Sequence, residues 1–346
     1  MKKTIKVEVD QRLIDACKPF DYLFDGTSTF EVPNFNAKNR DGSWSIGLIV
    51  GPSGSGKTTI LNHFYGITNS NEWNPNKAIA SQVDVDRLMA VGLNSVPSWC
   101  RPYHVLSNGE AFRANLAALI DTNTSFDEFT SVVDRNVAKS ASHAIQRFIR
   151  SQGMTGVVFS SCHYDIIPWL KPDWVFDIQK GLVAQQGFFR REQIEIVIER
   201  CDREWWGLFR NHHYLTGDMN KSARCFIAKW NDNPVAFASA LAFPNGNFKN
   251  AWREHRTVVL PDYQGLGIGV RLSDYIASYF VKNNCRYFSK TAHPRMAQHR
   301  ERSLLWKPTS KNKKARNDYN MERKTKEDGH KMAHKNRVCY SHEYIG

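Results

Sequence analysis

A glycine-rich segment at residues 51–58 contains the residue types that bind a nucleoside triphosphate. It reads Gly51-Pro52-Ser53-Gly54-Ser55-Gly56-Lys57-Thr58, between an apolar run at 45–50 and a helix-like stretch at 59–65. Glycines let successive backbone N–H groups surround a phosphate at the start of a helix. Lys57 can reach the β- and γ-phosphates, and the Thr58 hydroxyl can bind Mg²⁺. A glycine-rich surface turn is the alternative, but the strand–turn–helix context favours the triphosphate site.

Further polar residues follow strand-like segments downstream of this turn. Asp127 and Glu128 come after one such segment, and His163 follows a second, apolar one at 157–161. An Asp at a strand end can hold Mg²⁺ through water, and the adjacent carboxylate can orient or deprotonate an attacking water. Ser107 is followed three residues later by Glu110, which is the capping-box pattern of a helix start. Residues 78–82 are expected to form another strand, and 173–181 a closing hairpin.

In this order, the segments resemble the ABC-type ATPases. The resemblance implies Mg²⁺ ligands at Thr58, Gln82 and Asp127, and catalytic roles for Glu128 and the switch histidine His163. Gln82 stands at the Q-loop position. Asn108, Glu110 and Phe129 depart from the family pattern. ATP would be bound by the Walker A residues, the Q-loop and the signature segment, namely Gly51, Ser53, Gly54, Gly56, Lys57, Thr58, Thr59, Gln82, Ser107 and Gly109.

ABC-type ATPases close head to tail, so the resemblance also implies a homodimer in which the signature segment of one subunit meets the ATP of the other. The interval between Gln82 and Leu106 is too short for the full helical subdomain with which ABC exporters bind membrane partners. The chain contains no run of 18 apolar residues, the length that a membrane span needs. We therefore expect no membrane partner, and the comparison with ABC ATPases that act on nucleic acid or ribosomes is closer.

A second glycine-rich turn lies in the other half of the chain. A strand-like segment ends near Pro261, the turn contains Gly265, Gly267 and Gly269, and a helix is expected to begin near Val270. Backbone N–H groups at such a helix start can again bind an anion. The turn lacks the Lys-Thr pair of a P-loop, so a second triphosphate site is not expected.

The longer pattern around this turn resembles the GNAT acetyltransferases, whose loop of this type binds the pyrophosphate of acetyl-CoA. Gln264, Gly267 and Gly269 match the loop positions, and residues 258–260 match the strand that pairs with pantetheine. The resemblance implies acyl-CoA binding by Val259, Leu260, Gln264, Gly265, Gly267, Gly269 and Val270.

Catalytic residues of the second site are expected on the same strand and on a later helix. The GNAT resemblance places a general base at Glu254 and a general acid at Ser303. Strand alternation puts Glu254 and Arg256 on one face and His255 on the other, which makes His255 a rival base. A surface ion pair between Glu254 and Arg256 is the structural alternative.

Charge and cysteine content limit the partners and the compartment. The net charge is +13, and residues 282–337 contain 17 Lys/Arg against 5 Asp/Glu, which accounts for nearly all of it. A local basic block of this kind indicates a polyanionic partner, DNA or tRNA, more strongly than a diffuse surplus of charge would. A solvated basic segment without a ligand is the alternative.

Seven scattered cysteines without a CxxC pair indicate neither a zinc site nor a disulfide framework, and the reducing cytoplasm is expected. Residues 1–10 alternate apolar and polar types, which predicts an edge strand and not a signal peptide.

Taken together, the sequence predicts an α/β chain of two domains. A P-loop ABC-type ATPase domain is expected at 1–188, and a mixed-sheet α+β GNAT domain at 189–346 with a basic insertion at about 307–336. This order resembles predicted ATPase–acetyltransferase fusions of bacteria and phages. The leading hypothesis is an ATP-hydrolysing transferase that moves an acyl group from acetyl-CoA or another acyl-CoA to an amine on nucleic acid. Two alternatives are an ATPase clamp or sensor with a non-catalytic GNAT module, and an N-acetyltransferase acting on a protein or small amine.

Overall fold

The computed structural model describes residues 2–31, 34–68, 70–185, 194–213, 219–243, 248–316 and 337–346. The chain divides into two compact units, Met1–Gly92 with Pro102–Glu192, and Leu93–Arg101 with Gln193–Gly346. The predicted boundary at residue 188 lies outside the described residues, as does the 317–336 part of the predicted basic insertion. The sequence did not indicate that Leu93–Arg101 belongs to the second unit.

The first unit is built on a five-stranded sheet with the order β4-β5-β3-β6-β7. Its strands are β3 (Ile46–Val50), β4 (Ser125–Phe126), β5 (Val157–Ser161), β6 (Trp174–Asp177) and β7 (Gly181–Gln185). The central strand β3 is parallel to both β5 and β6, and all five of its residues are buried. An apolar run is expected of a parallel strand that is covered on both faces. Strand β7 is antiparallel to β6, which confirms the predicted hairpin.

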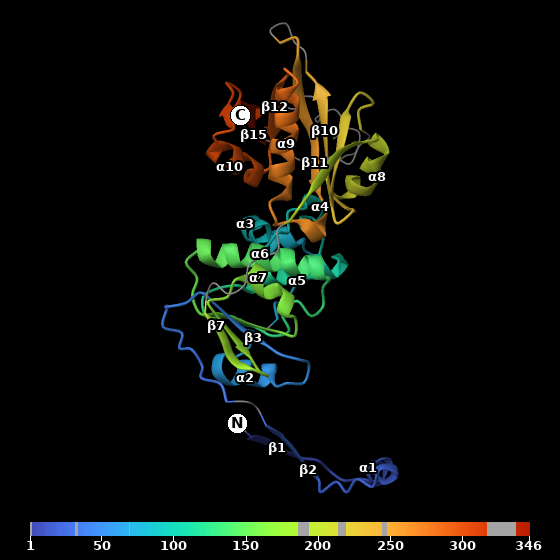
Figure 1. The fold of residues 1–346 in the computed structure, drawn as a ribbon, viewed down its shortest axis with the longest axis vertical. Helices are drawn as coiled ribbons and strands as arrows, with labels where there is room; N and C mark the ends of the chain where they lie inside the picture. The colour runs from blue at the N-terminus through green and yellow to red at the C-terminus, as the bar shows by residue number, and fades with distance from the viewer. Residues whose placement is uncertain are drawn as a thin grey trace. The chain divides into compact units, whose positions relative to one another are not determined.

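Helices and short 3₁₀ turns accompany this sheet (Figure 1). They are α2 (Lys57–Tyr65), η2 (Ile79–Ser81), α3 (Val85–Ala90), η3 (Tyr103–Val105), α5 (Asn108–Leu119), α6 (Arg135–Ser151), η4 (Tyr164–Ile166) and α7 (Ile167–Leu170). The predicted strand at 78–82 is wrong, because η2 occupies this stretch. The cause is local: the Gln82 amide pairs with the backbone of Asn74 and Lys77, which curls the chain into a closed loop.

The N-terminal residues form a small substructure of the first unit. Strand β1 (Lys2–Lys6) pairs antiparallel with β2 (Thr27–Glu31), which confirms the predicted N-terminal strand. Helix α1 (Gln11–Cys17) and the turn η1 (Lys18–Phe20) lie between them in the chain. Asp10 caps α1 by accepting the N–H of Leu13 at 2.8 Å.

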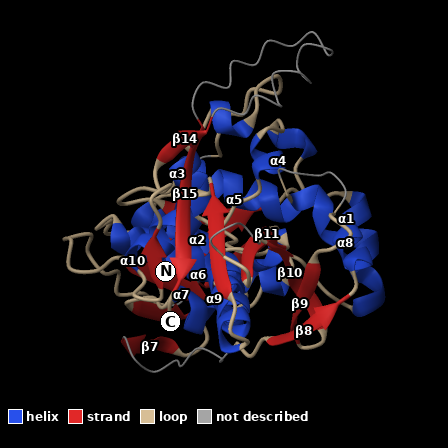
Figure 2. Ribbon diagram, turned by 90° about the horizontal axis from the view of Figure 1, so that it is seen from above, coloured by secondary structure: helices blue, strands red, loops and turns tan. Residues whose placement is uncertain are grey.

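The second unit contains a mixed sheet with the order β13-β15-β12-β11-β10-β9-β8, and β14 pairs with β15. Figure 2 shows its strands β8, β9 and β10 side by side. The strands are β8 (Val197–Cys201), β9 (Arg224–Trp230), β10 (Asn233–Ala242), β11 (Ala251–Val259), β12 (Arg286–Thr291), β13 (Trp306–Pro308), β14 (Lys314–Arg316) and β15 (Arg337–Tyr344). Only β11 and β12 are paired in parallel among these described strands. The predicted order of a parallel P-loop sheet followed by a mixed sheet is confirmed.

Helices cover both faces of the mixed sheet. They are α4 (Val96–Trp99), η5 (Arg203–Trp205), α8 (Trp206–Phe209), η6 (Arg210–His212), η7 (Pro261–Tyr263), α9 (Ile268–Lys282) and α10 (Pro294–Arg302). Phe226 packs on Phe280 of α9, whereas Phe237 packs on Trp206 of α8. Phe226 is paired with Ala238, so these two residues face the same side of the sheet. Phe237 is adjacent to Ala238 in the strand and therefore faces the other side. Helices α8 and α9 therefore lie on opposite faces of the sheet.

Two further properties of the described residues are relevant to function. None of their helices combines the length and apolar character that a bilayer crossing needs. In α8 and the preceding turn, Trp206 and Phe209 are buried, while Trp205 and Leu208 are exposed.

Candidate functional site

The turn after β3 has the backbone conformation of a phosphate-binding loop. Gly54 and Gly56 have φ values of 75° and 95°, in the left-handed region that glycine adopts without a steric penalty. Gly56 is also the N-cap of α2. Unpaired N–H groups and the positive end of the helix dipole are therefore directed at the turn, which suits a phosphate.

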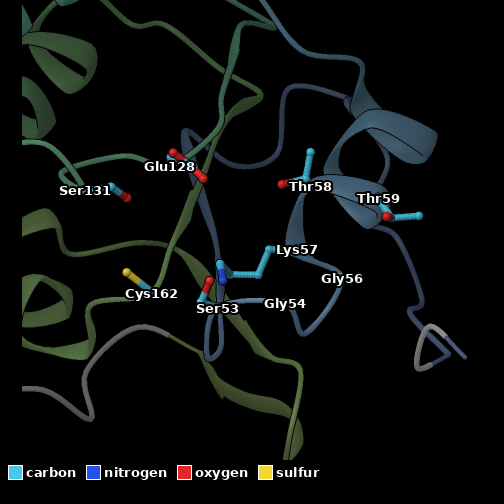
Figure 3. A pocket seen from close by; sticks show the side chains of 9 residues that line it. All are labelled: Ser53, Gly54, Gly56, Lys57, Thr58, Thr59, Glu128, Ser131 and Cys162. Carbon is cyan, nitrogen blue, oxygen red and sulfur yellow. The ribbon is translucent and has the colours of Figure 1, made fainter. Parts of the chain in front are cut away.

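Lys57 lies in a cavity of about 470 Å³ beside this turn (Figure 3). It is only 8% exposed, and its Nζ donates a hydrogen bond to the Pro52 carbonyl at 2.7 Å. The cavity is lined by Ser53, Gly54, Gly56, Lys57, Thr58, Thr59, Glu128, Ser131 and Cys162. All but the last two belong to the predicted site. Figure 3 shows Glu128, Ser131 and Cys162 on the chain that faces the P-loop.

Ser160 of β5 positions the two predicted carboxylates. Its hydroxyl donates to the Asp127 carboxylate and accepts the N–H of Glu128 at 3.2 Å. Its carbonyl accepts the N–H of Phe129 at 2.7 Å. Glu128 has a φ of 49°, a conformation that non-glycine residues rarely adopt, so this bonding holds a strained turn. Sequence reasoning missed Ser160, although two serines at the end of a buried apolar strand are a signal that could have found it.

Phe129, one of the departures from the ABC pattern, anchors the same turn. It is 2% exposed, and its ring centroid lies 4.4 Å from that of Phe159 and 5.6 Å from that of Phe112 on α5. The aromatic contacts connect the turn that carries Glu128 to both the sheet and α5.

His163 is connected to the end of this turn. Its Nδ1 lies 3.3 Å from the hydroxyl of Thr130, which is fully buried. Burial and the positive charge of Arg135 lower the pKa of His163, and Asp165 opposes this only in part. The imidazole is therefore neutral at pH 7 and offers one donor and one acceptor.

Gln82, Ser107 and Gly109 lie outside the set of residues that line this cavity. Both ends of the Gln82 amide are engaged by the loop before it: Oε1 accepts the N–H of Asn74 at 2.8 Å, and Nε2 donates to the Lys77 carbonyl at 3.0 Å. In this conformation the Gln82 side chain therefore holds the loop, and its predicted contacts with ATP and Mg²⁺ stay predictions.

Ser107 forms the predicted capping box with Glu110 at the start of α5, which is confirmed. Gly109 lies in the first turn of the same helix. Their predicted contact with the ATP of a second subunit stays a prediction.

Magnesium fits the oxygen donors of the cavity. The Thr58 hydroxyl and the Glu128 carboxylate line it, and Asp127 is the neighbour of Glu128. Mg²⁺ prefers such hard oxygen ligands and is usually held by one or two side chains together with substrate phosphates. Thr58 and Asp127 are the groups that would hold the ion.

The second glycine turn joins β11 to α9. Gly265 and Gly267 have φ values of 90° and 80°, and Gly267 is the N-cap of the 15-residue helix α9. A Cβ atom at Gly269 would lie 3.2 Å from a methyl group of Val259, so the turn lies close to the end of β11. The first N–H groups of α9, as far as Val270, have no partner within the helix, and a diphosphate fits this cradle.

The side chain of Gln264 is buried and hydrogen-bonded beside this turn. It is 7% exposed, its Nε2 donates to the Val259 carbonyl at 2.9 Å, and its Oε1 accepts the N–H of Asn94 at 2.8 Å. Both ends of the amide are therefore paired with backbone groups. The Gln264 side chain therefore supports the turn, and the predicted part of Gln264 in acyl-CoA binding stays a prediction.

The mixed sheet opens next to this turn. The parallel register of β11 with β12 ends at Arg253 and Phe288, whereas β12 stays paired with β15 on its other edge as far as Thr291. On its other side, β11 remains paired with β10 up to Val259. One edge of β11 from Glu254 onward therefore faces the opening between the strands. An extended amide chain such as pantetheine can add to an edge of this kind, as predicted for Val259 and Leu260.

A β-bulge in β11 changes which faces its side chains occupy. Ser239 pairs with Arg256 and Ala240 pairs with Glu254, so His255 is the extra residue. Arg256 lies over the Trp206 ring of α8, whereas Glu254 bonds Arg300 of α10. The prediction that Glu254 and Arg256 share a face is wrong, because a bulge interrupts the alternation on which it relied. The surface ion pair between them is wrong for the same reason.

The Glu254 carboxylate is the centre of a buried polar cluster. It accepts hydrogen bonds from Arg300 Nη2 at 2.7 Å, from the Thr257 hydroxyl at 2.8 Å, and from the Ser289 hydroxyl. Burial alone would raise its pKa, but Arg300 and the hydroxyls lower the pKa below its usual range. A paired carboxylate with a lowered pKa is a weak proton acceptor, so this geometry does not favour Glu254 as the general base, which stays a prediction.

Neutral imidazoles flank this cluster. Burial and the charges of Arg256 and Arg253 lower the pKa of His255 to about 4. Burial likewise lowers the pKa of His293, which follows β12, to about 4. Sequence reasoning missed His293. Ser303, the predicted general acid, lies at the C-terminal end of α10, and its hydroxyl accepts the N–H of Leu305 at 3.2 Å; its catalytic role stays a prediction.

Comparison with known proteins identifies the second unit. Residues 186–304 match the model of the Acetyltransferase (GNAT) family, so a GNAT domain lies in this part of the chain, as its loop pattern predicted. No curated protein matches the sequence.

ATP-binding cassettes and acetyltransferases are among the solved structures that are similar to parts of the chain. One is a dimeric ATP-binding cassette protein in a post-hydrolysis state with ADP and Pi, at 14% identity and a TM-score of 0.38, covering 48% of this chain and 95% of that one. Another is a GNAT-family acetyltransferase of Desulfovibrio desulfuricans, described as putative, at 13% identity and a TM-score of 0.31, covering 42% and 98%. A Bacillus subtilis acetyltransferase in complex with CoA matches at 12% identity and a TM-score of 0.33, covering 44% and 99%. Identities this low transfer no activity, so function is argued from the two sites.

Proposed function

We propose that this chain is an ATP-binding acyltransferase that moves an acyl group, acetyl in the simplest case, from acyl-CoA to an amine. The observation that carries the proposal is the recurrence of one device in both units. Each unit has a turn of left-handed glycines at the N-terminus of a helix, one beside the buried Lys57 and one beside the open edge of β11. The first suits a triphosphate and the second the diphosphate of coenzyme A.

At the first site, Lys57 would exchange its hydrogen bond to the Pro52 carbonyl for the β- and γ-phosphates. Mg²⁺, held by Thr58 and Asp127, would neutralise phosphate charge. Glu128 lines the cavity and would orient water, and the neutral His163 would contact the γ-phosphate. Ser107 and Gly109 of a second copy would complete the site, which makes the active ATP-bound form a homodimer.

At the second site, the amine nitrogen would attack the thioester carbonyl carbon. The new C–N bond forms as the C–S bond breaks, coenzyme A leaves as the thiolate, and the amine gives up one proton to a base. Backbone N–H groups along β11 would stabilise the oxyanion. Two groups compete as the base, the carboxylate of Glu254 and the neutral imidazole of His255, and pH–rate profiles of E254Q and H255N distinguish them.

Nucleic acid is the acceptor that the charge distribution supports. Residues 282–337 have a net charge of +12, and they include α10 and β12, which adjoin the open edge of the sheet. Phosphate contacts by such residues would make binding strongly dependent on salt. An amine on a tRNA or DNA base is the expected target, and an unstacked base would be needed for it to reach the thioester.

The test is intact-mass analysis of candidate acceptors after incubation with acetyl-CoA and Mg-ATP. A mixed tRNA pool, single-stranded DNA, a lysine peptide and small polyamines are compared, each with and without ATP. We expect an acetyl mass increment on nucleic acid. An increment confined to the peptide or polyamines would support an N-acetyltransferase for those amines and would reject nucleic acid as the acceptor.

A second candidate function is favoured by the buried ion pair of Glu254. In it, the protein is a nucleic-acid-binding ATPase clamp or sensor whose GNAT domain binds acyl-CoA without transferring the acyl group. This reading predicts ATP-dependent, salt-sensitive binding of tRNA or DNA, with intact acetyl-CoA recovered quantitatively after incubation. Release of free CoA thiol in proportion to acceptor would refute it.

A further inference from the structure

The segment Leu93–Arg101, here called the insert, is a short piece of chain that belongs to the second unit although both its flanks belong to the first. It contains α4, and the Trp99 indole N–H donates to the Leu93 carbonyl at 2.8 Å, which closes the insert into a compact loop. Leu93, Ser95 and Ser98 are buried. The insert is therefore an ordered part of the second unit and not a loose connection.

The insert is bonded to the support of the acyl-CoA turn. The Asn94 N–H donates to Gln264 Oε1 at 2.8 Å, while Gln264 Nε2 donates to the Val259 carbonyl at 2.9 Å. The buried amide of Gln264, the residue that precedes Gly265, thus joins the insert to the end of β11. Displacing the insert would leave the Gln264 carbonyl oxygen buried without this donor, which is costly.

The chain after the insert returns directly to the nucleotide-binding unit. Tyr103 stacks on Trp73 with ring centroids 4.9 Å apart, and its hydroxyl accepts from Asn115 Nδ2 at 2.6 Å. Asn115 Oδ1 in turn accepts the Trp73 indole N–H at 2.7 Å. Asn115 lies on α5, the helix that Ser107 caps.

The same cluster is adjacent to Gln82. The residue after Trp73 is Asn74, whose N–H donates a hydrogen bond to Gln82 Oε1 at 2.8 Å. On the other side of the insert, α3 ends at Ala90, and Arg87 Nε donates to the Ala117 carbonyl of α5 at 2.7 Å. Gln82 and the start of α5 were both predicted to bind ATP. Hydrogen bonds and ring stacking therefore connect both of them to the residues that precede and follow the insert in the chain.

We infer that the insert couples the two sites, so that nucleotide binding at the P-loop changes the affinity of the second unit for acyl-CoA through Asn94 and Gln264. The inference rests on the proposed function, because it requires both ligands to bind. A coupling of this kind is reciprocal: acyl-CoA must change the nucleotide affinity by the same factor. Gln264 and Tyr103 then act as positioning residues and touch neither ligand.

The test is calorimetric titration of the full chain with acetyl-CoA, with and without saturating Mg²⁺ and a non-hydrolysable ATP analogue. We expect the Kd for acetyl-CoA to change by roughly 5- to 150-fold, the usual range of allosteric coupling. The reverse titration should give the same factor. Two independent affinities would overturn the coupling while leaving the proposed function intact, whereas no acetyl-CoA binding at all would overturn both.

Two conservative variants test the route. Y103F removes the hydroxyl that accepts from Asn115 but keeps the ring on Trp73, and W99F removes the bond to Leu93 that closes the insert. Each should reduce the coupling factor toward 1 and leave the Kd of either ligand alone within about twofold of the wild-type value, a smaller change than any coupling in the usual range. Tyr22, which is 62% exposed in the first unit, provides the matched control Y22F. Coupling that persists unchanged in both Y103F and W99F would refute the route through the insert.

Discussion

Replacing Arg300 by Met tests whether the buried ion pair with Glu254 stabilises the second unit. The Arg300 side chain is 0% exposed and that of Glu254 is 11% exposed, with 2.7 Å between Nη2 and Oε2. Removing one partner of a buried ion pair leaves an uncompensated charge and costs about 3–5 kcal/mol. For a unit of this size, that corresponds to a fall in Tm of about 6–20 °C.

Arg286 provides the matched control. It also pairs with a glutamate in the second unit, Glu343, but the two side chains are 44% and 21% exposed. An exposed ion pair of this kind contributes about 0–1 kcal/mol. R286M should therefore shift the melting of the second unit far less than R300M.

The pH dependence of this difference has a definite sign. In the wild type, the pKa of Glu254 is lowered below its usual value of 4.5. The stabilisation is therefore fully present above the unfolded pKa and is lost as the pH falls through the lower folded pKa. In R300M the main lowering charge is gone, so burial raises the pKa of Glu254 and protonation relieves the unpaired charge. The stability gap between the wild type and R300M should be largest at pH 7 and should narrow toward pH 4.5.

Urea unfolding followed by circular dichroism at pH 7 and pH 4.5 measures both effects on the full chain. Two transitions are fitted, since two compact units need not unfold together. Equal destabilisation by R300M and R286M at pH 7 would refute the buried ion pair. A gap that widens as the pH falls would refute the assigned direction of the pKa shift.

Three further variants test the turns and the core. K57A should lose the stabilisation by Mg-ATP, which is about 2.7 kcal/mol at a ligand concentration of 100 times Kd. K77A, at an exposed loop position, should keep this stabilisation. A thermal-shift titration measures both, and retained stabilisation in K57A would contradict the P-loop assignment. G267A forces a side chain into φ 80° at a cost of roughly 1–2 kcal/mol and should weaken acetyl-CoA binding about tenfold in calorimetry, while G207A, where a Cβ meets nothing within 4 Å, should not. G47A places a Cβ 2.1 Å from the Trp174 ring in the buried sheet and should lower the urea midpoint of the first unit by overpacking, about 1–3 kcal/mol; an unchanged midpoint would show that the ring has room to move.

Local patterns account for what the sequence could predict. The P-loop at 51–58, the hairpin at 173–181, the helix cap at Ser107 and the turn at 264–269 are each specified by neighbouring residues, and each has the expected backbone form. The carboxylates Asp127 and Glu128 follow a strand as expected, but their support by Ser160 is a contact between strands and has no local pattern.

Interactions distant in sequence explain the errors. One extra residue at His255 was enough to move Glu254 and Arg256 to opposite faces, and the cation that meets Glu254 comes from α10. Gln82 and Gln264 are paired with backbone groups through local contacts, and their predicted ligand roles stay predictions. The membership of Leu93–Arg101 in the second unit likewise depends on Asn94 meeting Gln264, 170 residues away in the chain.

Native mass spectrometry of the full chain with Mg²⁺, a non-hydrolysable ATP analogue and acetyl-CoA tests the central claim most directly, that one chain holds a triphosphate and a coenzyme A at separate turns. We expect one nucleotide and one acetyl-CoA bound to each chain at the same time, with K57A losing only the nucleotide and G267A retaining it. Competition of the two ligands for a single site, or the loss of both in K57A, would contradict it.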